Sequence, residues 1–387
     1  MTATTTHLLF NQAVERRRKL DFPFIGITGS NGKTTVKRML RAILSKHGRV
    51  YDFAYDSDTA EKIAQELMTL SGSWDWALVK IGASAADEVK RSTELIRPKV
   101  GVITNIGEAH LAVHGTIEKI MHNKAQLLNG LEPGGWAVLN RDNEYVKALG
   151  EGDFTATRFF GLSELADYFA ANITPLGPEG TAFTVHRKNK SSLRLHLPIY
   201  SLGDVYNALA AIAVADGLGV PDEIIADSLE HDFLLPEGRG RLHRMADLLL
   251  FDDTYDATPQ SLIKSTVCLM QCKEVARRLI LVLGDMTELG NQADYYQKMI
   301  GHYLAGMPID LVVICGQHAS STAEAMRSGK QQAMTIMEFP LVSQVIEFLL
   351  NEIRPGDAVM VEGGANQDLS AVVRALRRTF AKTTETV

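Results

Sequence analysis

The pattern with the clearest chemistry is Thr28-Gly29-Ser30-Asn31-Gly32-Lys33-Thr34-Thr35, which follows an apolar segment and opens a run of helical periodicity. Glycines let backbone N–H groups turn toward phosphate oxygens, and a helix N-terminus adds partial positive charge. Lys33 would neutralise the β- and γ-phosphates of a nucleotide, and the Thr34 hydroxyl would ligate magnesium. The spacing Gly-x-x-Gly-Lys-Thr is short, because Ile27 stands where the general pattern has its first glycine. The sequence therefore predicts a phosphate-binding loop.

The elements around this loop alternate between short apolar strands and helices, which is typical of a parallel sheet covered by helices. Helical spacing after the loop continues until Gly48, and a second helix is expected at about 116–129. Between residues 154 and 199 the period falls towards two, which predicts a small antiparallel patch before a helix at 207–215. The strands expected in this α/β domain are 24–27, 77–81, 100–104 and 136–139.

A second α/β domain is expected after Pro236–Arg241, a run of turn formers and charges without apolar periodicity. Strands at 248–251, 279–283, 311–315 and 358–361 predict a Rossmann-like domain there. At the other end of the chain, the basic cluster Arg16–Lys19 is expected on the solvated face of a short helix. We predict three parts: an N-terminal extension over 1–21, a P-loop central domain with a mostly parallel sheet over 22–239, and a C-terminal domain over 240–387.

Composition restricts the class of protein. The 387 residues are 45% hydrophobic and 22% charged, which is ordinary for a globular chain. The net charge of -6 argues against a general electrostatic grip on nucleic acid or on anionic lipid. Three cysteines without a C-x-x-C pair support neither a disulfide framework nor a zinc site. With no long apolar run and no signal-peptide pattern, we expect a cytoplasmic protein with no nucleic-acid or membrane partner.

Further motifs carry a resemblance to a known family. The short loop, together with Asn105–Leu111 (Asn-Ile-Gly-Glu-Ala-His-Leu), resembles the Mur ligase family of ATP-dependent amide-bond-forming enzymes. Asp252–Ser261 and Leu283–Gly290 resemble its MurF branch, which joins D-alanyl-D-alanine to a UDP-linked muramoyl tripeptide. The resemblance spans roughly residues 22 to 380, without a separate N-terminal domain to hold a UDP-sugar. We therefore expect a smaller donor, or a donor presented by a partner protein.

The resemblance implies roles for individual residues near the loop. Magnesium would be held by Thr34, His110 and Lys124, the last at the position where these enzymes carry a carbamylated lysine. A carbamate would replace a repelling ammonium by a carboxylate-like oxygen ligand. Outside this family context, His110 would be a packed or surface histidine and Lys124 a solvated helix lysine. The ATP phosphates would be held by Gly29, Ser30, Asn31, Gly32, Lys33, Thr34 and Thr35.

The resemblance also implies contacts to the rest of the nucleotide. Asn207 lies where the family contacts adenine, and an amide suits the paired donor and acceptor of that ring. Its usual upstream partners are altered here to Gly203 and Asp204. Outside this family context, an acid followed by an aromatic residue at a strand end, as in Asp253 and Tyr255, would be a common turn. The positions that match residues closing over the nucleotide are Arg241, Asp253 and Tyr255.

Two positions depart from the family pattern. Lys80 stands where the family has a magnesium-binding glutamate, and an ammonium about 4 Å from a divalent ion would cost on the order of 8 kcal/mol at an effective dielectric constant near 20. Either magnesium is held by Thr34, His110 and modified Lys124 alone, or Lys80 contacts a phosphate oxygen and one metal is lost. The second departure is Glu362, in place of the lysine of a Lys-Gly-Ser motif, which favours an amine or a cation over a substrate carboxylate.

These observations predict an ATP-dependent ligase that joins a small-molecule carboxylate to an amine such as an amino acid or a dipeptide. ATP would convert the carboxylate to an acyl phosphate, and the amine would then displace phosphate. Lys33, magnesium and Lys80 would offset the charge on the transferred phosphoryl group. Two alternatives stay open: a folylpolyglutamate-synthase-like or polyamide-forming ligase, and a nucleotide-binding subunit or pseudoenzyme.

Overall fold

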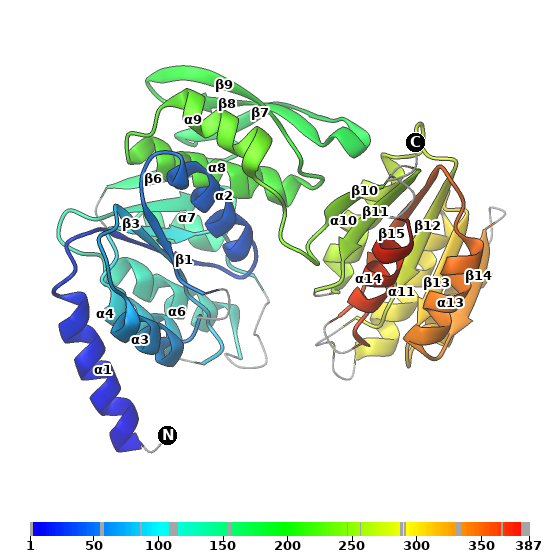
Figure 1. Ribbon diagram of the computed structural model, residues 1–387, viewed down its shortest axis with the longest axis horizontal. Helices are drawn as coiled ribbons and strands as arrows, with labels where there is room; N and C mark the ends of the chain where they lie inside the picture. The colour runs from blue at the N-terminus through cyan, green and yellow to red at the C-terminus, as the bar shows by residue number, and fades with distance from the viewer. Residues whose placement is uncertain are drawn as a thin grey trace. The chain divides into compact units, whose positions relative to one another are not determined.

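The computed structural model describes residues 3–54, 58–85, 87–107, 115–152, 156–245, 247–255, 257–286, 289, 292–329, 334–364 and 367–380. The chain forms two compact units, each with its own sheet (Figure 1). The first unit comprises Met1–Thr174, Ala182–Pro198 and Leu202–Phe233. The second comprises Pro175–Thr181, Ile199–Ser201 and Leu234–Val387.

The first unit is built on a sheet of nine strands in the order β2-β3-β1-β4-β5-β6-β7-β8-β9. Neighbouring strands from β2 to β7 pair in parallel. The two residues between β8 and β9 form a turn with Asn189 at φ 61°, so these hydrogen-bonded neighbours run antiparallel. The strands are β1 Phe24–Thr28, β2 Val50–Asp52, β3 Trp76–Lys80, β4 Val100–Ile103, β5 Trp136–Asn140, β6 Thr157–Gly161, β7 Tyr168–Pro175, β8 Thr181–Arg187 and β9 Lys190–Leu197.

Helices cover both faces of this sheet. Alternate residues of β3 and the residue that follows it, Ala77, Val79 and Ile81, join one apolar cluster with residues of α3, α4 and α6. The helix α2 contacts β1 and β3 and packs against α8, which in turn contacts β5 and β6. The helices of the unit are α1 Ala3–Arg17, α2 Lys33–Ser45, α3 Ala60–Thr69, α4 Glu88–Ile96, α6 Ile117–Asn129, α7 Glu144–Gly150, α8 Leu202–Gly217 and α9 Asp222–Asp227.

The basic cluster at the end of α1 is only partly solvated. The guanidinium of Arg17 donates to the carbonyl oxygens of Ile96 (2.6 Å), Leu20 (3.0 Å) and Arg97 (3.2 Å) and lies 4.1 Å from the centre of the Phe24 ring. Burial lowers the pKa of this group. The expectation of a solvated face is therefore wrong for Arg17, because carbonyl groups at the end of α4 are available to accept from it.

The second unit is built on a six-stranded sheet in the order β10-β11-β15-β12-β13-β14. Only β10 runs antiparallel to its neighbour, and the other strands pair in parallel. The strands are β10 Arg241–Met245, β11 Leu248–Asp253, β12 Arg278–Leu283, β13 Leu311–Cys315, β14 Thr335–Phe339 and β15 Asp357–Glu362. The helices are α10 Pro259–Met270, α11 Ala293–Ala305, α12 Ala319–Ser328, α13 Val342–Glu352 and α14 Ser370–Phe380.

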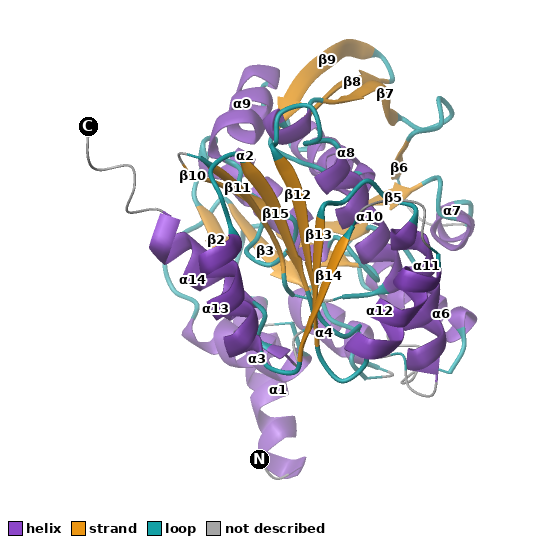
Figure 2. Ribbon diagram, turned by 90° about the vertical axis from the view of Figure 1, so that its right-hand side faces the viewer, coloured by secondary structure: helices purple, strands orange, loops and turns teal. Residues whose placement is uncertain are grey.

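The predicted fold class is confirmed. Strands and helices alternate in both units, and Figure 2 shows helices on both sides of the second unit's sheet. The antiparallel patch is present but is shorter than expected, because β6 pairs in parallel with both of its neighbours. Within the described parts of the chain, no helix is long and apolar enough to cross a membrane.

Candidate functional site

The loop between β1 and α2 has a backbone that only glycine can adopt at two points. Gly29 has φ 148°, and a Cβ atom there would lie 1.9 Å from Oγ1 of Thr104. Gly32 has φ 84°, and a Cβ atom there would lie 2.2 Å from Oδ1 of Asn207. Positive φ values and these close contacts explain the glycine spacing physically. The loop can therefore turn its backbone N–H groups toward an anion at the start of α2.

Residues that follow β4 brace the loop from the side. The backbone N–H of Ser30 donates to the carbonyl oxygen of Asn105 at 2.9 Å, and the N–H of Asn31 donates to Oδ1 of Asn105 at 2.8 Å. The N–H of Gly107 donates to Oγ of Ser30 at 2.9 Å, and the Thr104 hydroxyl donates to the carbonyl oxygen of Asn31. The Asn-Ile-Gly motif thus fixes the shape of the phosphate loop, a role that the sequence alone did not suggest.

The side chains at the start of α2 are placed for phosphate chemistry. Nζ of Lys33 lies 2.7 Å from the carbonyl oxygen of Gly29 and 3.2 Å from that of Ser30, so the ammonium curls over the loop. Thr34 and Thr35 are buried in the first helical turn. Gly32 has no side chain to cap the helix, which leaves the N–H groups of that turn without a side-chain acceptor from the N-cap.

Lys124 is enclosed in the first unit. It lies on α6, the helix that packs against β1 and β4, and its side chain is only 1% exposed. Among the described residues, its Nζ has no hydrogen-bond partner. Burial lowers the pKa of this amine to about 8 because the charged form is poorly solvated. The solvated-lysine alternative is therefore wrong for Lys124, whereas its role in metal binding stays a prediction.

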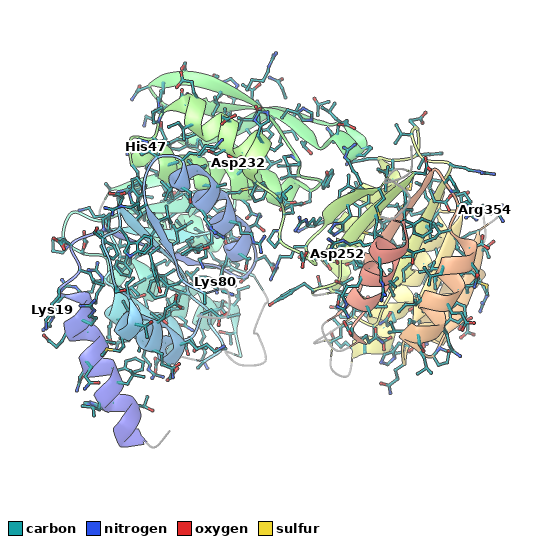
Figure 3. The ribbon with its side chains drawn as sticks, in the orientation of Figure 1. Lys19, His47, Lys80, Asp232, Asp252 and Arg354 are labelled. Carbon is teal, nitrogen blue, oxygen red and sulfur yellow. The ribbon has the colours of Figure 1, made fainter. Side chains whose placement is uncertain are left out.

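Two buried lysines on the sheet face that α2 covers are paired with acids. Nζ of Lys80, at the end of β3, lies 3.3 Å from Oδ2 of Asp58 (Figure 3 labels Lys80). Nζ of Lys37, one turn into α2, lies 2.7 Å from Oδ1 of Asp52. Burial lowers the pKa of Lys37, and Asp52 opposes that shift. The sequence singled out Lys80 but gave no sign of Asp58, which follows a strand of only three residues.

The structure describes Asn207 but not His110, and both were predicted to belong to the site. The amide of Asn207, on α8, lies against Gly32 of the phosphate loop and donates to Oδ1 of Asp204 at 3.4 Å. That position brings Asn207 to the loop itself, and its contact with adenine stays a prediction. His110 lies outside the described residues, so its predicted part in metal binding also stays a prediction.

In the second unit, predicted site residues gather at the carboxyl ends of two neighbouring strands. Asp253 ends β11 and is the register partner of Glu362, which ends β15. Oδ2 of Asp253 accepts from the Ser265 hydroxyl at 2.6 Å, and Oε1 of Glu362 accepts from the Ser261 hydroxyl at 2.7 Å. Both serines lie on α10. The helix thus holds two carboxylates side by side at one edge of the sheet.

The other two predicted residues of this unit lie near its first strand. Tyr255 is 44% exposed, and the guanidinium of Arg239 lies 4.0 Å from the centre of its ring. Arg241 begins β10, with Nη1 3.8 Å from Oε1 of Glu237. Neither arrangement by itself identifies a ligand, so the roles of Arg241 and Tyr255 in closing over a nucleotide stay predictions.

The segment around Gly238 is held by a buried acid. Oδ2 of Asp252 accepts from the N–H of Gly238 at 2.9 Å, and Oδ1 accepts from the Thr254 hydroxyl at 2.7 Å. Burial alone would raise the pKa of Asp252, but the bonds from His243, Thr254 and Gly238 outweigh it and the pKa is lowered. The supposed linker is therefore attached firmly to the second unit from Gly238 onward.

Asp285 is a structural centre that the sequence did not reveal. Its carboxylate accepts from the N–H groups of Gln317 (2.7 Å) and His318 (3.0 Å) and from Nε2 of Gln367 (2.9 Å). The N–H of Asp285 donates back to Oε1 of Gln367 at 2.7 Å. One side chain therefore ties together the loops that follow β12, β13 and β15.

Comparison with known sequences identifies the family. The profile described as Mur ligase middle domain matches residues 27–215, and the profile described as Mur ligase, glutamate ligase domain, matches residues 238–365. The chain belongs to the Mur ligase family. It is accordingly an ATP-dependent ligase of the kind that forms amide bonds, as the sequence predicted.

The relatives agree on one branch of this family. The UDP-N-acetylmuramoyl-tripeptide--D-alanyl-D-alanine ligase of Synechocystis sp. is 28% identical over 365 residues, which cover 93% of this chain and 76% of that protein. The enzyme of the same name from Escherichia coli is 27% identical over 382 residues, 96% of this chain and 81% of that protein. A crystal structure of MurF from Acinetobacter baumannii matches with a TM-score of 0.87 at 27% identity, covering 98% of this chain and 82% of that one. This Mur ligase is therefore MurF-like.

Proposed function

We propose that this Mur ligase joins a carboxylate donor to an amine acceptor through an acyl phosphate, at the expense of ATP. The observation that carries the proposal is the phosphate loop, in which Gly29 and Gly32 have positive φ and Lys33 lies over the loop carbonyls. This arrangement suits the β- and γ-phosphates of a nucleotide better than a neutral ligand, because both the ammonium and the helix N-terminus favour negative charge.

The reaction that we propose has two steps. A carboxylate oxygen of the donor attacks the γ-phosphorus of ATP, the bond to the bridging oxygen breaks, and ADP leaves. The uncharged amine then attacks the acyl carbon, the tetrahedral intermediate loses inorganic phosphate, and an amide remains after the amine has released a proton. Lys33 would stabilise negative charge on the transferred phosphoryl group during the first step.

Magnesium fits the oxygen donors that the first unit offers. The Thr34 hydroxyl lies in the first turn of α2, and Lys124 would add oxygen ligands as a carbamate. Carbamylation consumes a neutral amine and CO2 and releases a proton. Burial lowers the pKa of Lys124 to about 8, so more of its amine is neutral near neutral pH than in a solvated lysine. When bound, magnesium would neutralise phosphate charge, and Lys124 and Thr34 would be the described residues that hold it.

The second unit would supply the acceptor side of the reaction. Asp253 and Glu362 present two carboxylates at one sheet edge, each oriented by a serine of α10. Carboxylates attract the protonated, ammonium form of an amine and repel a carboxylate. We therefore propose that these acids favour acceptors with a free amino group, whereas Arg241 and Tyr255 would contact the nucleotide.

The test is release of ADP from ATP by the purified chain with a matrix of carboxylates and amines. One cell of the matrix pairs UDP-N-acetylmuramoyl tripeptide with D-alanyl-D-alanine, the substrates in the names of the relatives. Other cells pair shorter carboxylates and amino acids with the same partners. Release that needs both an acid and an amine would support the ligase and identify the substrates. Release that ignores both substrates would contradict it.

A further inference from the structure

We propose that Lys80, held ready by Asp58, serves as a resident cation for the phosphates of the nucleotide and takes the place of one divalent metal ion. This inference rests on the proposed nucleotide site and adds to it a residue that sets how strongly binding depends on metal.

The position of Lys80 follows from the sheet. Lys80 is the register partner of Ile27, two residues before the phosphate loop turns at Gly29. The Thr28 hydroxyl donates to the carbonyl oxygen of Ile81 at 3.1 Å, which ties the end of β3 to the start of the loop. The end of β3 therefore reaches the same edge of the sheet as the loop.

The side chain of Lys80 lies on the face of the sheet that α2 covers. Its neighbours Val79 and Ile81 belong to the apolar cluster of α3, α4 and α6, and successive side chains of a strand point to opposite faces. The charge of Lys80 also contributes to the lowered pKa of Lys37, which is on α2. Lys80 therefore lies beneath the helix whose N-terminus would meet the phosphates.

The ion pairs of the two buried lysines differ in their exposure to water. Nζ of Lys37 lies 2.7 Å from Oδ1 of Asp52, and Nζ of Lys80 lies 3.3 Å from Oδ2 of Asp58. The Lys80 side chain is 7% exposed, whereas that of Asp58 is 36% exposed. A buried ammonium whose partner is half-solvated can exchange that partner for a phosphate oxygen, because water then solvates the released carboxylate.

The backbone of Asp58 is fixed in a position from which its carboxylate can pair with Lys80 again when the nucleotide leaves. Its carbonyl oxygen accepts from the N–H of Gly82 at 2.8 Å, and a Cβ atom at Gly82 would lie 3.0 Å from that oxygen. The backbone of Asp58 is therefore fixed against the segment that follows β3 while its carboxylate stays partly solvated. In this arrangement Lys80 has a counter-ion in the absence of nucleotide, and it does not have to be stored as an unpaired buried charge.

The chemical consequence concerns metal. An ammonium and a divalent cation cannot share the same few ångströms without strong repulsion. A phosphate tail that contacts both Lys33 and Lys80 already has two positive partners, so it needs fewer metal ions to be bound. The affinity of wild type for a nucleotide should therefore fall less on removal of magnesium than the affinity of a variant without the Lys80 charge.

The experiment is calorimetry with a non-hydrolysable ATP analogue, once with excess magnesium and once with EDTA, on the full chain. In Lys80→Gln we expect the affinity in EDTA to fall by about tenfold and the affinity with magnesium to fall much less. Lys80→Arg should keep most of the affinity in EDTA, and Asp58→Asn should strengthen it, because a competing carboxylate is lost. The matched controls are Lys46→Gln and Asp227→Asn, an exposed ion pair of the same unit, which should change neither value.

Two results would overturn the inference. One is an equal ratio of the affinities with and without magnesium in Lys80→Gln and in wild type. The other is two manganese ions per nucleotide-bound wild-type chain, counted by electron paramagnetic resonance. If Lys80→Gln does not fold, as judged by circular dichroism, the ratio of the affinities with and without magnesium is measured in Asp58→Asn and in Lys80→Arg instead. Absence of any nucleotide binding by wild type would instead contradict the proposed function, so the two failures are distinguishable.

Discussion

The two sheets of this ligase present different ionisable groups near the carboxyl ends of their strands. In the first unit, Lys33 lies over the phosphate loop, and Lys37 and Lys80 are paired with Asp52 and Asp58. In the second unit, Asp253 and Glu362 end adjacent strands. The architecture is the same in both, with parallel strands that deliver polar side chains to their carboxyl ends. In both units the strands provide the position, and we propose that the charge of the final residue selects the ligand.

Two further ionisable side chains, one in each unit, also differ in their hydrogen-bond partners. Asp285 of the second unit binds three loops together through backbone and side-chain N–H groups. Nζ of Lys124 in the first unit has no hydrogen-bond partner among the described residues, and burial lowers the pKa of this amine. We infer that the acid stabilises the fold, whereas the lysine is kept for chemistry at a cost in stability.

Removal of the Lys33 charge should have the largest effect. Lys33→Ala should weaken nucleotide binding and slow turnover by about 100-fold or more, because this ammonium acts directly on phosphate charge. Isothermal calorimetry and ADP release measure the two effects. Lys46→Ala is the matched control, since Lys46 lies at the other end of α2 in exposed ion pairs with Asp227 and Asp232. Equal nucleotide affinity in Lys33→Ala and wild type would refute the phosphate-loop assignment.

Lys124 should show opposite effects on activity and stability. Lys124→Met should abolish turnover yet raise the free energy of unfolding at pH 7 in CO2-depleted buffer, by about 3 kcal/mol at most. Below a pH of about 8 the wild-type amine is charged and buried, which costs stability. Between about 8 and 10.5 the unfolded chain binds more protons than the folded chain, so wild-type stability rises with pH and the advantage of methionine shrinks.

Chemical denaturation at pH 7 and at about pH 9.5 measures this change. A second variant tests the carbamate: Lys124→Ala should lose activity, and added short carboxylates should restore part of it. Full activity of Lys124→Ala without additives would remove Lys124 from the site. A lower stability of Lys124→Met at pH 7 would show that burial does not penalise the lysine.

Asp285→Ala should destabilise the second unit by about 3 kcal/mol, because three N–H donors lose a charged acceptor. Asp285→Asn should lose less, since one acceptor oxygen remains. Thermal unfolding measures the loss, and calorimetry with nucleotide checks that binding to the first unit persists. An unchanged melting temperature in Asp285→Ala would mean that water replaces the carboxylate without cost.

The smallest effect is expected at Glu362. Glu362→Gln should raise KM for the amine acceptor by about tenfold and leave nucleotide affinity unchanged, because a neutral amide attracts an ammonium or amine less strongly. Ser261→Ala, which removes the hydrogen bond to Oε1, should act in the same direction but more weakly. Steady-state kinetics at varied acceptor concentration measure this KM. A change in KM for ATP alone would instead show that Glu362 acts on the nucleotide and not on the acceptor.

Local signals in the sequence were sufficient for much of this fold. The strand, the glycine loop and the helix from residue 24 to 45 lie close together in the chain, and apolar periodicity located most strands of both sheets. The three-residue strand β2 and the half-buried strand β14 gave no comparable signal. Short or partly exposed strands lack the apolar run on which such predictions depend.

The site was harder to predict where it depends on distant pairs. Lys80 and Asp58 are brought together by the loop after β2, and Asp285 and Gln367 lie 82 residues apart in the chain. No local pattern marks such partners, because the topology of the sheet alone makes them neighbours. The burial of Lys124 was also hidden, since a lysine on an amphipathic helix is normally solvated.

In the proposed reaction, the donor carboxylate is phosphorylated before the amide forms. The most direct test uses the donor that gives the most ADP in the substrate matrix, labelled with ¹⁸O in its carboxylate, together with the acceptor amine and ATP. Mass spectrometry of the released inorganic phosphate then reports the path of the oxygen. If an acyl phosphate forms, we expect one ¹⁸O atom in each phosphate and none in ADP. Unlabelled phosphate, or label in the nucleotide product, would contradict it.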